Sequence, residues 1–424
     1  MKKKTGVPNS FGVRFLNLIL ILGLILIGID QSCADGDTAC PESNTIRVGL
    51  YHWAPNVEQF KFAIRNAWNE KHPDVSLEFA GFDEWDGGYM SDPTDNLDVF
   101  AFDTIFLSLF MKQGYLNPIK DSEVEGLSDF LPFLIDGSKA DGKLWGIPQV
   151  TSPHVFFYRK GDTELEQVSS LSDMVKFLGT CSYIEEKPPE NKGLGIALYD
   201  DSLIAILYIE ALQDIHGVYT TEPSLPFEAA KLDNQAITDL RRIASMSSMK
   251  NARYYQKEPY NEYVQARWFS DGHGRATFGF TDSLSVMSRE TVRNVRFKPM
   301  PLSDRGKIPP YWTVIIGINS KTEIRAMAIK LANLIASPDV LVKSIGGTGR
   351  SEHGHQYLMP SRPSAFEKLI SMSSHYEAMY QLAKDADSKV LRFGPNVKKW
   401  LGQMKGTITQ RVFGEPVCPD ENGE

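Results

Sequence analysis

Strand-like and helix-like segments alternate in the first part of the chain, and this alternation limits the possible folds more than any other feature. A short apolar segment, 46–51, is followed by a helical pattern that stops before Pro73. A second apolar segment, 75–79, and a loop rich in Gly, Asp and Pro, 82–95, lead to a third, 97–103. Strand, helix, strand, loop and strand at this spacing predict a parallel α/β sheet. The helical pattern places its apolar residues at i, i+3, i+4, i+7 and i+8, namely Phe60, Ala63, Ile64, Ala67 and Trp68.

A second α/β region is expected to begin near Phe156. Its helical patterns cover 203–212 and the stretch around 237–246, with a further segment at 263–269. The alternating residues 312–318 predict a strand that returns to the first region, and a helix is expected over 323–335. A chain that crosses two or three times between α/β lobes predicts a two-lobed fold of the type II periplasmic-binding-protein class, with a ligand cleft between the lobes. The expected boundaries are a first lobe at 46–152 with a return segment at about 312–345, a second lobe at 153–311 with about 346–410, and a tail at 411–424.

The N-terminus has the pattern of an export signal. Lys2, Lys3, Lys4 and Arg14 precede an apolar run at 15–29, and a polar stretch follows that ends Ser32-Cys33-Ala34. This pattern predicts a signal peptide at 1–34, cleaved after Ala34, a linker at 35–45, and a periplasmic or secreted protein. An uncleaved signal anchor is one alternative. A lipoprotein attached at Cys33 is another, although Asp30-Gln31-Ser32 is a poor context for lipidation.

Charge and cysteine content narrow the possible partners. The net charge of −8 and the pI near 5.6 provide no basic surface for nucleic acid. Cys40, Cys181 and Cys418 remain after cleavage. In an oxidising compartment Cys40 and Cys418 could form a disulfide, although the sequence leaves the pairing of the cysteines open. Cys181 is interpreted as a half-buried free thiol.

Many short blocks between Ile46 and Leu401 resemble bacterial thiaminase I (thiamine pyridinylase). The most informative block is 146–161, Gly-Ile-Pro-Gln-Val-Thr-Ser-Pro-His-Val-Phe-Phe-Tyr-Arg-Lys-Gly. Further blocks are 97–107, 114–116, 191–193, 263–264, 268–269, 274–276, 295–299 and 319–322. The resemblance implies the type II periplasmic-binding-protein fold. It also implies an enzyme that exchanges the thiazolium of thiamine for another base, through a cysteine nucleophile and a carboxylate general base.

The two catalytic positions of that family are substituted here. Ser152 stands at the cysteine position and Asp282 at that of the family's Glu. An alcohol needs a positioned base to lose its proton as it attacks, whereas a thiol with a pKa near 8.5 is already partly ionised. Asp is also one methylene shorter than Glu, and a misplacement of about 1 Å can cost about a hundredfold. The expectation is therefore lost or altered catalysis.

The resemblance also implies an aromatic ligand site with a changed polar lining. Tyr51, Tyr89, Tyr263 and Asp103 match residues that hold the pyrimidine; capping of the next helix is the alternative role of Asp103. Other positions depart from the family: Trp53, Phe280 and Trp312 each replace a tyrosine, and Val314 replaces an aspartate. These changes keep aromatic surface and remove hydrogen-bonding groups, so they predict a different or less polar heteroaromatic ligand.

Two enzymatic alternatives stay open. One is an active transferase in which Ser152 attacks with help from Asp282. The other is a hydrolase in which Ser152 acts with His154, although the Gly-x-Ser-x-Gly elbow is absent. The nearby His353 and His355 are interpreted as part of a solvated loop rather than a metal site, and Asp83, Glu84, Asp86 and Asp92 as a cleft-edge loop that supplies Tyr89. No metal, cofactor or nucleic-acid partner is expected, and the protein is predicted to be a monomer that binds a small heteroaromatic ligand.

Overall fold

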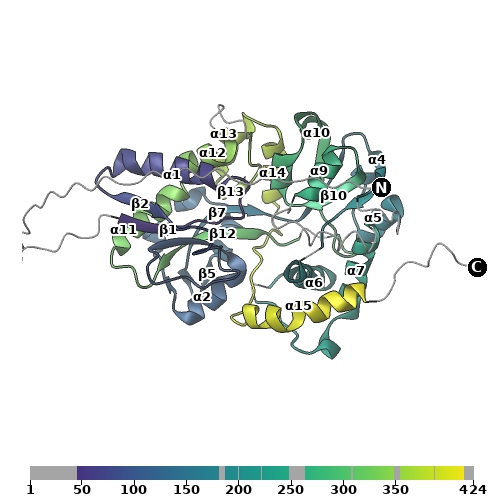
Figure 1. Ribbon diagram of the computed structural model, residues 1–424, viewed down its shortest axis with the longest axis horizontal. Coiled ribbons are helices and arrows are strands. Elements are labelled where there is room, and N and C mark those ends of the chain that lie inside the picture. The colour runs from purple at the N-terminus through teal and green to yellow at the C-terminus, as the bar shows by residue number, and fades with distance from the viewer. Residues whose placement is uncertain are drawn as a thin grey trace, which may run out of the picture. The chain divides into compact units, whose positions relative to one another are not determined.

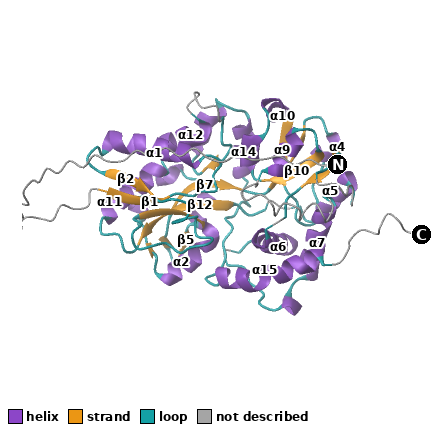
Figure 2. Cartoon of the chain, viewed as in Figure 1, coloured by secondary structure: helices purple, strands orange, loops and turns teal. Residues whose placement is uncertain are grey.

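The fold is described from a computed structural model of the chain. The described residues are 45–180, 187–198, 200–220, 222–247, 263–306, 309–347, 354–385 and 387–414. Outside these ranges lie the predicted signal peptide, Cys40, Cys181, Cys418, His353 and the end of the predicted tail. The described residues form a mixed α/β structure with two main sheets (Figure 1 and Figure 2).

The larger sheet has seven strands in the order β13-β7-β12-β3-β1-β2, with β4 paired to β12. β1, β2 and β3 run parallel, as the sequence predicts. β12 is antiparallel to both β3 and β7, so the sheet is mixed rather than purely parallel. The strands are β1 (Thr45–Gly49), β2 (Ser76–Phe79), β3 (Val99–Asp103), β4 (Leu116–Asn117), β7 (Ile147–Ser152), β12 (Trp312–Asn319) and β13 (Met359–Pro360).

The helices of this region lie against the sheet or against one another. The expected amphipathic helix is α1 (Val57–Lys71), which Asn56 caps by accepting from the backbone N–H of Gln59. α1 packs against α11 (Arg325–Ile335) and α12 (Pro338–Gly346), and α11 lies on β3, β7 and β12. The other elements here are η1 (Thr104–Phe106), α2 (Leu107–Gln113), η2 (Asp121–Glu123), η3 (Leu127–Asp129), α3 (Pro132–Gly137), β5 (Lys139–Ala140), β6 (Lys143–Leu144), α13 (Pro363–Ile370) and α14 (His375–Ala383).

The smaller sheet has four strands in the order β11-β8-β10-β9. These strands are β8 (Val155–Arg159), β9 (Glu190–Gly195), β10 (Gly274–Gly279) and β11 (Val295–Pro299). α9 (Val264–Ser270) packs on β9 and β10, and α5 (Leu171–Leu178) packs on β9 and on α7 (Asn234–Ser245). The accompanying helices are α4 (Thr163–Glu166), α5 (Leu171–Leu178), α6 (Asp201–His216), η4 (Ala229–Lys231), α7 (Asn234–Ser245), α9 (Val264–Ser270), η6 (Thr281–Val286), α10 (Arg289–Asn294) and α15 (Val397–Phe413).

α6 is a buried helix that carries an acidic residue, Glu210, among its buried side chains. Asp200 caps its first turn by accepting from the backbone N–H of Ser202, and the helix ends at Gly217 in the left-handed conformation, with φ of 64°. Its middle, from Ile204 to Ala211, is buried all round, as is typical of a core helix rather than a surface helix. α6 packs against both α7 and α15 (Figure 1).

The crossing pattern agrees with the expected fold class. The chain leaves the larger sheet at the end of β7 and enters the smaller sheet at β8, and it returns with β12. The segment 346–410 divides between the two regions, because β13 pairs with β7 whereas α15 packs on α6 and α7. Within the described residues, no helix is long and apolar enough to cross a membrane.

Candidate functional site

The carboxyl ends of two parallel strands and the start of an antiparallel one meet at one edge of the larger sheet. β3 ends at Asp103, β7 ends at Ser152, and β12 begins at Trp312. In the strand register Ser152 lies opposite Trp312, and Asp103 lies opposite Val314. Since residues two apart in a strand share a face, the register brings these predicted positions together. The carboxyl edge of an α/β sheet is the usual location of a ligand site.

Asp103 is the centre of a buried polar cluster. Its Oδ2 accepts from the hydroxyl of Tyr89 at 3.1 Å and from that of Tyr51 at 3.5 Å. Its Oδ1 accepts from the backbone N–H of Ile105 at 3.4 Å, so the same side chain also caps η1. The capping role considered from the sequence is therefore present, and the ligand-binding role of Asp103 stays a prediction. The pKa of Asp103 is raised to about 7, chiefly by burial and to a lesser degree by the nearby charge of Glu210, while these hydrogen bonds lower it.

The loop after β2 presents Tyr89 to this cluster. Asp86 is buried and holds the loop by accepting from the backbone N–H groups of Gly88 and Met90. Gly88 has φ of 99°, and a Cβ there would lie 2.7 Å from the ring of Phe110, so the close approach of the loop needs glycine. The acidic loop thus supplies Tyr89, as the sequence predicts.

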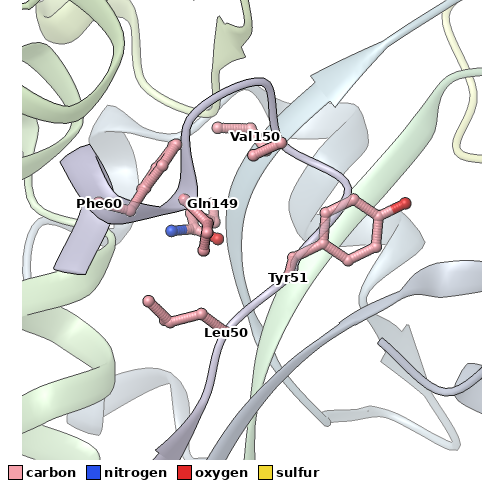
Figure 3. A pocket seen from close by; sticks show the side chains of 7 residues that line it. Leu50, Tyr51, Phe60, Gln149 and Val150 are labelled. Atoms are coloured by element: carbon pink, nitrogen blue, oxygen red, sulfur yellow. The ribbon is translucent and has the colours of Figure 1, made fainter. Parts of the chain in front are cut away.

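Trp53 joins the cluster from the other side. Its indole Nε1 donates to the carbonyl of Asp86 at 2.7 Å, and its ring meets Tyr89 edge-on at 5.9 Å. A shallow hollow lies beside Tyr51, lined by Leu50, Tyr51, Ala54, Val57, Phe60, Gln149 and Val150. In Figure 3 the Tyr51 ring points away from Phe60 and Leu50, with its hydroxyl at the far end. Tyr51 thus lines this hollow and also donates to the carboxylate of Asp103.

Ser152 is buried, and its hydroxyl bonds to the segment after β10. Its Oγ lies 3.1 Å from Thr281 Oγ1, and it accepts from the backbone N–H of Thr281 at 3.2 Å. A longer contact, 3.3 Å, joins it to the carbonyl of Pro153. The hydroxyl is thus held by a neighbouring alcohol and a backbone donor, neither of which is a base.

Asp282 lies next to Thr281 but has a different partner. Its Oδ2 accepts from the hydroxyl of Tyr263 at 2.8 Å, while its Oδ1 is buried without a hydrogen-bond partner in the described structure. Burial raises the pKa of Asp282 to about 6, and the Tyr263 hydroxyl partly offsets this. Within the described residues, no hydrogen bond joins Ser152 to Asp282.

A buried hydrogen-bond network lies next to these residues, and its central residue, Glu210, was not among the residues predicted from the sequence. Glu210 on α6 accepts from the indole Nε1 of Trp312 at 2.8 Å, and its other oxygen lies 3.0 Å from His154 Nδ1. The imidazole of His154 stacks on Phe280 at 4.3 Å. Sequence reasoning missed Glu210; the available signal was an acidic residue within an otherwise apolar helical run.

The hydrolase alternative has no support in this geometry. A serine nucleophile needs a histidine within hydrogen-bonding reach, and that histidine needs an orienting carboxylate. His154 has a carboxylate partner in Glu210, but the hydrogen bonds of Ser152 go to Thr281 and Pro153.

Among the described residues, no group of three or more His, Cys, Asp or Glu side chains could hold a metal ion. His355 packs against the rings of Tyr357 and Tyr376.

The predicted ligand residues form two neighbouring groups. The first group consists of Tyr51, Trp53, Tyr89 and Asp103. The second group comes from or faces the β7–β8 and β10–η6 junctions and consists of Ser152, Tyr263, Phe280, Asp282 and Trp312. Trp312 joins this second group through edge contacts with Phe280 at 5.4 Å and with His154 at 5.6 Å. The arrangement offers aromatic faces, two buried carboxylates of raised pKa, and a serine whose hydrogen bonds within the described residues go to Thr281 and Pro153.

Comparisons with known proteins identify the relatives of this chain. Residues 153–303 match the model of the Thiaminase-1 domain. The chain is 34% identical to Thiaminase-1 of Paenibacillus thiaminolyticus over 402 residues, covering 95% of this chain and 96% of that protein.

Solved structures agree with this similarity. Thiaminase I from Bacillus thiaminolyticus superposes with a TM-score of 0.83 at 34% identity, covering 87% of this chain and 99% of the other. Clostridium botulinum thiaminase I in complex with thiamin gives 0.82 at 34% identity, with the same coverage. The maltose-bound MalE3 of T. maritima, at 16% identity, gives 0.65 over 88% of this chain and 95% of that one, and shares the fold.

Proposed function

The chain belongs to the thiaminase I family, and on that premise we propose that it binds a small heteroaromatic molecule without the family's catalysis. The ligand is thiamine-like or pyrimidine-like, and it is held at the carboxyl edge of the larger sheet, in the cleft expected of the fold. Tyr51, Trp53, Tyr89, Asp103, Tyr263, Phe280 and Trp312 contact it. Export by a cleaved signal peptide and a monomeric state belong to the same proposal.

Ligand binding is supported by the first group of residues. One carboxylate oxygen of Asp103 accepts from the hydroxyls of Tyr51 and Tyr89, and the ring of Trp53 packs edge-on against Tyr89. Aromatic faces stack on a heteroaromatic ring, and a carboxylate accepts from an exocyclic amine or a protonated ring nitrogen. With a pKa of about 7, Asp103 is able to carry or release a proton near neutral pH.

The separation of Ser152 from Asp282 carries the catalytic half of the proposal. A serine nucleophile is activated by a base that receives its proton during attack. Here the Ser152 hydroxyl accepts a hydrogen bond from the backbone of Thr281, which draws electron density away from the oxygen. Asp282 is instead bonded to Tyr263. The pair that would have to act together is not joined.

One observation favours an active transferase as the second candidate. The Oδ1 of Asp282 is buried and has no partner in the described structure, and the pKa of this carboxyl is about 6. A general base works best with a pKa near the operating pH. Rotation of Ser152 toward this oxygen on ligand binding would assemble a nucleophile and base.

Calorimetric titration with thiamine tests the binding half. The native protein is expected to bind saturably, and Asp103→Leu to bind at least about tenfold more weakly, because it loses a charge-assisted hydrogen bond. Asp98→Asn is the matched control, since this aspartate at the opposite end of β3 bonds to Thr322 and the backbone of Arg47. Absence of saturable binding to thiamine and to its isolated aminopyrimidine would contradict the proposed ligand class.

A further inference from the structure

Glu210 is a fully buried carboxylate to which the proposed ligand chemistry assigns no role. Its relative exposure is 0%. Its Oε1 accepts from Trp312 Nε1 at 2.8 Å, and its Oε2 lies 3.0 Å from His154 Nδ1. Burying a carboxylate is costly unless its oxygens are hydrogen-bonded, and here both oxygens are. Through these two bonds Glu210 holds Trp312 Nε1 and His154 Nδ1 against α6.

These bonds tie separate parts of the fold together. Trp312 begins β12 of the larger sheet, whereas Glu210 lies in the middle of α6, which packs against α7 and α15. His154 lies in the short connection between β7 and β8, two residues after Ser152. One side chain on α6 thus holds the start of one strand and the connection between two others, all at the edge where the candidate ligand residues gather.

The network continues into aromatic packing. The imidazole of His154 stacks on Phe280 at 4.3 Å with an interplanar angle of 21°, and on Phe278 at 4.8 Å with an angle of 25°. Trp312 meets Phe280 edge-on at 5.4 Å. Fixing His154 and Trp312 therefore also fixes Phe280, and the three rings form one continuous wall.

We propose that Glu210 and His154 are positioning residues that orient Trp312 and Phe280 as one wall of the ligand site. The inference rests on the proposed function, because it takes that wall to meet the ligand. The indole has a single donor, which Glu210 occupies, so Trp312 offers the ligand only carbon surface. Phe280 has no polar atom in its side chain, and neither has Val314 in the same strand as Trp312. The part of the ligand that meets this wall is therefore an apolar or flat aromatic group without hydrogen-bonding atoms.

Two substitutions at position 210 separate positioning from bulk structure. Glu210→Gln keeps an oxygen that accepts from Trp312, and its amide donates to His154 Nδ1 in the other imidazole tautomer. Glu210→Leu removes both bonds at similar volume. Glu222→Gln is the matched control, because Glu222 accepts from Ser108 and belongs to neither ligand group.

The indole N–H resonance of Trp312 reports the hydrogen bond directly. It is measured by ¹H–¹⁵N correlation in the ligand-free full chain and assigned as the resonance missing from Trp312→Phe. A bond to a carboxylate moves this proton downfield, so Glu210→Leu is expected to shift it upfield, whereas Glu210→Gln and Glu222→Gln keep it close to its native position. An unchanged resonance in folded Glu210→Leu would overturn the proposal.

Affinity for thiamine, titrated calorimetrically, supplies the second readout. Glu210→Leu and Trp312→Phe are expected to bind about tenfold more weakly than the native protein, and Glu210→Gln within about threefold of it. Equal losses of affinity in Glu210→Gln and Glu210→Leu would overturn a role through hydrogen-bond geometry. Native affinity in Trp312→Phe would overturn the proposal as well. That second result tests the proposal even if Glu210→Leu does not fold. Should the native protein bind neither thiamine nor its isolated aminopyrimidine, the proposed function fails on that result, and the Trp312 resonance alone tests the positioning role.

Discussion

The hydroxyl of Ser152 lies 3.1 Å from that of Thr281, and it accepts from the Thr281 backbone N–H at 3.2 Å. Asp282 follows Thr281 directly in the chain but bonds to Tyr263. The nucleophile position and the base position thus share a neighbour without contacting each other through a hydrogen bond. The proposed loss of the family's catalysis rests on this arrangement.

Restoring the family residues should restore turnover. In the double variant Ser152→Cys with Asp282→Glu, the thiol supplies a soft nucleophile and the longer side chain extends the carboxylate by one methylene. We expect exchange of the thiazole of thiamine for an aromatic amine at a rate at least about a hundredfold above the native chain. Product mass is the measurement.

Each single variant serves as a control for this prediction. Asp282→Glu alone keeps the alcohol and should remain inactive, whereas Ser152→Cys alone should gain part of the activity. A double variant that binds thiamine and still forms no product would contradict the prediction that these two substitutions limit the reaction.

The raised pKa of Asp103 predicts a pH dependence of stability. The pKa of this carboxyl is about 7 in the folded protein, against an ordinary value of 3.8, so the folded state binds more protons between these values. Stability from Asp103 is therefore full below about pH 4 and is lost as pH rises to about 7, by on the order of 4 kcal/mol in total.

Urea unfolding at pH 4.5 and at pH 8 checks this prediction. Asp103→Asn carries no such proton, so it should lose less stability than the native protein between these two pH values. An equal loss in the two proteins would contradict the assignment. Asp282→Asn should behave in the same direction with a smaller effect, because its pKa is about 6.

The turn that presents Tyr89 should not tolerate a side chain at Gly88. In Gly88→Ala the new Cβ would lie 2.7 Å from Phe110 at a φ of 99°, so we expect a loss of about 1–3 kcal/mol of stability and weaker thiamine binding. Gly81→Ala is the matched control, because its Cβ would meet no atom within 4 Å. Equal effects of the two substitutions on unfolding and binding would refute the role of this turn.

The sequence predicted the elements whose periodicity is strong. α1, the parallel strands β1 to β3 and the returning strand β12 occur where the apolar pattern placed them. The pattern did not reveal that the sheet is mixed, because β12 is buried on both faces, and the apolar pattern of such a strand does not show in which direction it runs. It also could not assign β13, whose residues Met359–Pro360 are too few to show a period.

The candidate site was predictable only in part. The resemblance placed Ser152, Asp103 and Asp282 near one another, but it gave no hydrogen-bond partners, which depend on the rotamers of residues far apart in the chain. Glu210 lies 102 positions from Trp312 along the sequence, and only the packing of α6 brings them together. The sequence likewise did not show that Asp282 bonds to Tyr263 rather than to Ser152.

Product analysis of the native protein tests the central claim most directly. Purified mature chain is incubated with thiamine and an excess of aniline or pyridine, and the mixture is analysed by mass spectrometry beside Ser152→Ala and the Ser152→Cys, Asp282→Glu variant. We predict saturable thiamine binding, no exchange product from the native protein above the Ser152→Ala background, and product from the double variant. Exchange product from the native protein that disappears in Ser152→Ala would contradict the claim and establish Ser152 as a working nucleophile.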